Sequence, residues 1–131
     1  MAEITKTTSK IAQVYPGKSE VLGYKTAVAV TAGQAVTLNT SGLLVVADAN
    51  DAAANTFIGI ALESVGAGVA CPVLMAGYVS GFTVSSLNAM APVYLSDDAG
   101  KVDTAAGTVS VVVGFVGSLP DGTKCLYVAG R

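Results

Sequence analysis

The chain has 131 residues, of which 52% are hydrophobic and only 12% carry a charge. A chain of this length buries roughly two thirds of its unfolded surface, so one domain can hold a core without disulfides or metals. Its high apolar fraction excludes a disordered chain, and its formal net charge of −2 argues against nucleic acid as a partner. Because the chain contains no His, we expect no His-based catalysis, no Cys/His zinc site and no cofactor, and hence no enzyme.

The two cysteines, Cys71 and Cys125, lie far apart in the sequence. The chain begins with polar residues and shows no cleavable signal peptide, so we expect buried, reduced thiols rather than a disulfide. The most apolar region, Val65 to Val79, is interrupted by three Gly and a Pro and is too short for a membrane helix. The sequence therefore predicts a soluble protein with no membrane partner.

The first 25 residues differ in charge from the rest of the chain. They carry a net charge of +2, whereas residues 26–131 carry −4. This leader is rich in Thr and Ser, contains Pro16-Gly17 and lacks a sustained apolar pattern. We interpret residues 1–24 as an extended N-terminal arm and residues 25–131 as a β domain. The alternative is that Ile11 to Tyr15 forms an ordinary first strand on a sheet edge.

From Thr26 onward, short apolar runs alternate with Gly-containing turns. This spacing predicts an all-β fold, a compact Gly-rich β-sandwich or barrel-like domain. One short helix is expected over Asp48 to Asn55, where Asp48 or Asn50 could cap its start. The expected strands cover residues 26–31, 34–39, 43–47, 56–64, 70–75, 78–84, 92–96, 101–103, 108–116 and 124–128.

Two segments of the domain share one pattern. Residues 35–44 and 92–102 each read as strand, Gly turn and strand, and each is followed by a buried strand with a central glycine, Gly59 or Gly114. These matches predict an internal duplication of about residues 34–62 and 91–117. The alternative is that strands built from Val, Ala and Gly resemble one another by chance.

The low charge content also bears on the surface of the protein. With seven basic and nine acidic residues, much of the exterior must consist of Ala, Ser, Thr, Val and Gly. Asp97, Asp98 and Asp103 lack the ligand spacing of a calcium loop and indicate a solvated hairpin. Because monomeric domains rarely leave large apolar patches bare, we expect burial in a homo-oligomer or on a larger assembly.

Four short motifs carry a family resemblance. Residues 32–38 (AGQAVTL), 57–63 (FIGIALE), 91–95 (APVYL) and 114–117 (GFVG) resemble motifs of tailed-bacteriophage head decoration proteins, also called capsid cement proteins. The resemblance implies a trimeric β-rich virion protein on the outer capsid surface, made in the cytoplasm of the host bacterium. It also implies an N-terminal arm that reaches over neighbouring subunits of the major capsid protein.

From the resemblance and the leader together, we expect a structural protein that stabilises an assembled capsid by bridging its subunits. The lysines of the arm would meet acidic lattice surface, and Ile11 to Tyr15 would add as a strand to an exposed sheet edge. The alternatives are a phage tail or fibre subunit and a small ligand- or sugar-binding β-barrel, although the eight aromatic residues look scattered. The residues assigned to the capsid-binding arm are Lys6, Lys10, Ile11, Val14, Tyr15 and Lys18.

Overall fold

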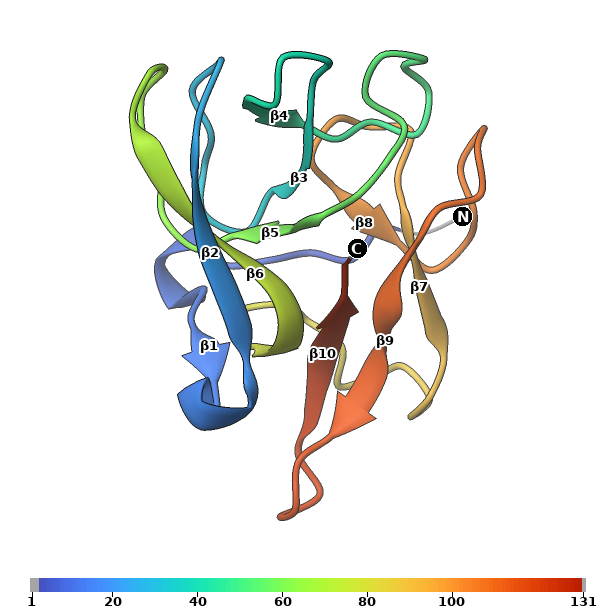
Figure 1. Cartoon of the computed structure of the whole chain (residues 1–131). Coiled ribbons are helices and arrows are strands. Elements are labelled where there is room, and N and C mark those ends of the chain that lie inside the picture. The colour runs from blue at the N-terminus through green and yellow to red at the C-terminus, as the bar shows by residue number, and fades with distance from the viewer. Residues whose placement is uncertain (1–2, 131) are drawn as a thin grey trace.

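The computed structural model describes residues 3–130, so Met1 and Ala2 of the predicted arm and Arg131 lie outside the described residues. The structure is nearly all β, with 42% of residues in strands and 4% in helices, which confirms the predicted fold class. The strands form one antiparallel sheet that curls into a half-barrel (Figure 1). No helix within residues 3–130 is long and apolar enough to cross a membrane. The strands are β1 (Gln13–Val14), β2 (Glu20–Lys25), β3 (Ala35–Leu38), β4 (Leu44–Val46), β5 (Gly59–Ala61), β6 (Ala70–Val79), β7 (Pro92–Leu95), β8 (Val102–Asp103), β9 (Val112–Ser118) and β10 (Lys124–Ala129), and the helices are the 3-10 turns η1 (Thr8–Lys10) and η2 (Pro16–Lys18).

The sheet consists of two units with the same strand order. The path of the sheet is β4-β3-β5-β6-β10-β9-β7-β8. The first unit contains β3 to β6 and the second contains β7 to β10, and the two units meet where β6 pairs with β10. The register repeats as well, because Val36 lies opposite Gly59 in the first unit and Val93 lies opposite Gly114 in the second. The two units include residues 34–62 and 91–117, the two segments that share a sequence pattern. Their origin by duplication stays a prediction.

The two central glycines explain why both units need glycine at this position. A Cβ added at Gly59 would run into the backbone carbonyl of Leu74, and one at Gly114 would run into that of Tyr127. Leu74 and Tyr127 hold the same register position in their units. Neighbouring strands therefore approach so closely at these points that only a residue without a side chain fits.

Two hydrophobic clusters stabilise the fold. The larger one lies between the units and joins Ile60 and Leu74 of the first to side chains of the second such as Leu126. The smaller one lies within the first unit around Val36 and Val73. β3, β5 and β6 contribute to both clusters, because successive residues such as Val73 and Leu74 point to opposite faces of the sheet.

The ends of the curled sheet are joined through the β7–β8 hairpin. The N–H of Ala35 donates to the carbonyl of Gly100 over 3.0 Å, and the N–H of Gly100 donates to the carbonyl of Ala47 over 2.7 Å. Gly100 has a φ of 76°, which glycine adopts without steric cost. This hairpin therefore links the first unit to the second.

The helix predicted over Asp48 to Asn55 is wrong. The segment forms two successive turns instead, and in each an Asp side chain accepts a hydrogen bond from a backbone N–H two residues ahead. The donors are Asn50 for Asp48 and Ala53 for Asp51. Such local bonds compete with helical ones and favour turns.

The strand predicted over residues 26–31 is also wrong. These residues form only isolated bridges, Thr26 to Leu44 and Val30 to Val65, while the strand lies just before them, in β2. The runs expected as two strands over residues 70–75 and 78–84 join into β6, which continues through Gly77. Gly77 adopts a φ of 136°, a conformation that glycine allows within the strand.

Candidate functional site

Residues 3–25, which contain most of the predicted arm, lie along the body of the protein in this structure. β2 pairs with β6 over its whole length, and β1 pairs with Tyr78 and Val79 of the same strand. Nearer the N-terminus, the N–H of Ile4 donates to the carbonyl of Val102 over 2.9 Å, and the Ile4 side chain is buried in the larger cluster. β1 thus pairs with the sheet of its own chain, which is the alternative arrangement given above for Ile11 to Tyr15.

The three predicted lysines have different surroundings. Lys10 and Lys18 are exposed, each at the end of a 3-10 turn. Lys6 is half-buried, and a Cβ added at Gly33 would lie 2.8 Å from its Cδ atom. Burial lowers the pKa of Lys6, the positive charge of Lys101 lowers it further, and Glu3 opposes both effects. The structure thus separates Lys6, which is held against the body, from two lysines that extend into solvent.

The three other predicted residues lie along β1 and its flanks. Ile11 packs against the larger cluster between two glycines, and a Cβ added at Gly81 would lie 2.7 Å from its Cδ1 atom. Val14 is half-buried opposite Tyr78. Tyr15 is 45% exposed and has a φ of 55°. Tyr15 is therefore the apolar residue of this group that is best placed to meet a partner.

A row of aromatic rings crosses the outer face of the sheet. Tyr15 contacts Tyr78 edge to face with ring centroids 6.4 Å apart, and Tyr78 contacts Tyr127 in the same way at 5.0 Å. Phe115 stacks on Tyr127 at 5.0 Å. The sequence analysis missed this row, because the four rings come from separate segments and meet only through the register of β6, β9 and β10.

Two rings of the row, Phe115 and Tyr127, occupy positions whose counterparts in the first unit are buried. Phe115 pairs with Tyr127 as Ile60 pairs with Leu74, and the side chains of Ile60 and Leu74 are 0% exposed. Phe115 and Tyr127 remain half-exposed on the outside. We define the outer aromatic face as the four rings of the row together with the exposed Val112 of β9. The four rings are those of Tyr15, Tyr78, Phe115 and Tyr127. The outer aromatic face contains no Asp, Glu, Lys or Arg residue.

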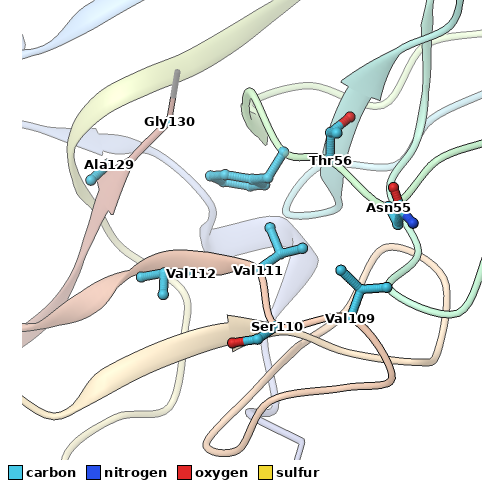
Figure 2. Close-up of a pocket in the computed structure, with 9 residues that line it drawn as sticks. Asn55, Thr56, Val109, Ser110, Val111, Val112, Ala129 and Gly130 are labelled. Carbon is cyan, nitrogen blue, oxygen red and sulfur yellow. The ribbon is translucent and has the colours of Figure 1, made fainter.

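A cavity of about 360 Å³ includes Val112 in its lining. Figure 2 shows it between the segment 109–112, the chain at Asn55 and Thr56, and the C-terminal residues Ala129 and Gly130. Val109 and Val112 are among the large apolar residues that stay exposed, at 39% and 55%. The cavity therefore adds an uncharged hollow beside the end of β9.

Within residues 3–130, no group of three or more His, Cys, Asp or Glu side chains could hold a metal ion. Cys71 and Cys125 are buried free thiols, and burial raises the pKa of each. No protein-family model, curated protein or solved structure matches this chain.

Proposed function

We propose that this protein decorates an assembled bacteriophage capsid and stabilises it by bridging neighbouring capsid subunits. The outer aromatic face carries this proposal. It places four rings and the 55% exposed side chain of Val112 on the outside of the sheet. Aromatic residues are enriched and charged residues depleted at the centre of protein–protein interfaces, so this face has the composition of a contact surface.

The comparison of the two units supports the same role. In the first unit the positions of Ile60 and Leu74 are covered by the rest of the chain, whereas the equivalent Phe115 and Tyr127 are open to a partner. A trimer that contacts several capsid subunits raises the effective concentration for each further contact. Modest interfaces can then resist disassembly, with no catalytic step and no cofactor. The proposed location is the outer capsid surface of the virion.

The sugar-binding alternative is less favoured by the geometry of the rings. A sugar platform needs an open ring face, but the Tyr127 ring is engaged by two neighbours, because Phe115 stacks on it and Tyr78 packs edge to face against it. The rings therefore engage one another, as cross-strand pairs that stabilise a sheet do. A tail or fibre subunit is distinguished by location, since labelled protein would decorate tails rather than capsids in electron micrographs.

The test is a charge placed in the outer aromatic face. Val112→Asp should weaken co-sedimentation with undecorated capsids at least tenfold, because a carboxylate buried at an interface without a partner costs more than about 1.4 kcal/mol. Val69→Asp is the matched control, since Val69 is 51% exposed and belongs to neither the row nor the cavity. Equal binding by both variants and the wild type would refute this face as the contact surface. Circular dichroism of both variants checks that they fold.

The trimer is tested separately by light scattering on dilute protein with and without capsids. We expect trimers in solution or on the capsid. A protein that stays monomeric in solution and binds each capsid site as a number of copies that is not a multiple of three would contradict the trimer. Val112 is exposed in the single chain, so the outer aromatic face could also be the interface between subunits of the trimer. If it is, the Val112→Asp variant should fail to form trimers in solution even without capsids.

A further inference from the structure

A second hollow lies where the N-terminal segment crosses the β7–β8 hairpin. It has a volume of about 280 Å³, and its lining includes Glu3, Thr5, Lys6 and Thr8 of the leader and Lys101 of the hairpin. The hydrogen bond from Ile4 N–H to the Val102 carbonyl, 2.9 Å long, holds the two segments together. The site is therefore built from residues that are distant in sequence and fixed by backbone pairing.

The lining of this hollow contains more lysine than acidic side chains. The Glu3 carboxylate lies 3.7 Å from the Lys101 ammonium group and also accepts a hydrogen bond from the Ser96 hydroxyl over 3.2 Å. Within residues 3–130, no carboxylate lies within 4.0 Å of the Lys6 ammonium group. The lining of the hollow thus holds two lysines and one glutamate, and the Glu3 carboxylate already contacts Lys101 and Ser96. The Lys6 ammonium group is partly removed from water, where a nearby anion would stabilise its charge.

The stem of the Lys6 side chain packs against Gly33. Its Cδ atom lies 2.8 Å from where a Cβ of Gly33 would be, so its stem rests directly on the glycine backbone. Gly33 has a φ of 89°, a conformation that further disfavours a larger residue there. A lysine confined in this way loses less conformational entropy on binding than a free surface lysine.

We propose that this hollow is a subsite for a carboxylate side chain from an acidic segment of the capsid protein. The Lys6 and Lys101 ammonium groups would hold the carboxylate, with the Thr5 and Thr8 hydroxyls as further donors. The naming of the capsid as partner rests on the proposed function, whereas the preference for a carboxylate rests on the site alone. The exposed lysines of the first 25 residues, Lys10, Lys18 and Lys25, lie outside this subsite.

The experiment is an NMR titration of the full chain with a synthetic octapeptide of alternating Asp and Gly. The same peptide with Asn in place of Asp is the neutral control, and free succinate represents a small dicarboxylate. The Asp peptide should shift the side-chain resonances of Lys6 and Lys101 and leave those of Lys10 and Lys18 in place. It should also raise the pKa of Lys6, because the bound carboxylate offsets the repulsion from Lys101.

Substitutions separate this subsite from general attraction. Lys6→Gln keeps a stem over Gly33 but removes the charge, and with Lys101→Gln it should lower peptide affinity about three- to tenfold, whereas Lys10→Gln should not. Equal shifts at all lysines, or an equal loss with Lys10→Gln, would overturn the subsite. Binding of succinate as tight as that of the peptide would overturn a protein segment as its occupant. Failure of the wild type to bind capsids would instead refute the proposed function and leave the peptide result intact.

Discussion

Met90 occupies in the second unit the turn position that Gly33 occupies in the first. The Gly33 N–H donates to the carbonyl of Ala61 over 2.8 Å, and the Met90 N–H donates to that of Val116 over 2.7 Å. Both residues are in the left-handed region, with φ values of 89° and 70°. The leader lies over Gly33 and leaves no room for a side chain, whereas the Met90 side chain is 71% exposed.

This relationship predicts opposite effects of substitution at the two turns. Met90→Gly should leave the free energy of unfolding unchanged or raise it by up to about 1 kcal/mol, because glycine relieves the left-handed strain but gains unfolded-state entropy. Gly33→Met should lower it by more than about 2 kcal/mol, since the new side chain would meet Lys6 and Ile11. Urea denaturation measures both. A clear loss of stability in Met90→Gly would show that the exposed side chain makes contacts that matter for folding.

The central glycines of the two units should be equally intolerant of a side chain. Gly59→Ala and Gly114→Ala should each lower the free energy of unfolding by about 2 kcal/mol or more, because each Cβ would push against a neighbouring backbone carbonyl. Gly23→Ala is the control, since a Cβ at this strand position would meet nothing within 4 Å. Thermal or urea denaturation gives the three values. Tolerance at one site but not the other would show that the units differ in their strand spacing.

A single substitution tests whether the leader stays packed in solution. Ile4 is 8% exposed and belongs to the larger cluster, so Ile4→Ala should cost about 2–4 kcal/mol. Val28→Ala, at a side chain that is 42% exposed, should cost less than about 1 kcal/mol. Comparable small losses in both variants would mean that residues near the N-terminus detach, as the extended arm requires.

The sequence predicts the strands of the domain better than the path of its leader. Period-two patterns and Gly turns locate β3, β4, β7 and β10 to within one or two residues, because these signals are local. β2 has only four uncharged residues between Glu20 and Lys25 and lies in a region rich in polar residues, so its composition suggests an arm. Its strand conformation depends on pairing with β6, a distant segment that composition does not reveal.

The candidate surfaces depend even more on tertiary register. The repeated glycines, Gly59 and Gly114, are visible in the sequence, because the close strand contact selects the residue type itself. The aromatic row is not, since Tyr78 and Tyr127 look unrelated until β6 and β10 pair. The Lys6–Lys101 hollow likewise needs the leader to cross the second unit. A position that requires one residue type, such as glycine, can therefore be found in the sequence. A surface that forms only when distant strands pair cannot.

The buried thiols predict a pH dependence of stability. Burial raises the pKa of Cys71 and of Cys125, so the folded state favours the neutral thiol. Their contribution should be fully present below the unfolded thiol pKa of about 8.5 and be lost as pH rises through the higher folded values. Replacing both with Ala should cost about 1–3 kcal/mol in packing at pH 7, and this difference from the wild type should shrink as the pH rises above the unfolded thiol pKa of about 8.5. Urea denaturation of both proteins under reducing conditions measures it, and a difference that stays constant with pH would mean that the thiols ionise as freely in the folded protein as in the unfolded chain.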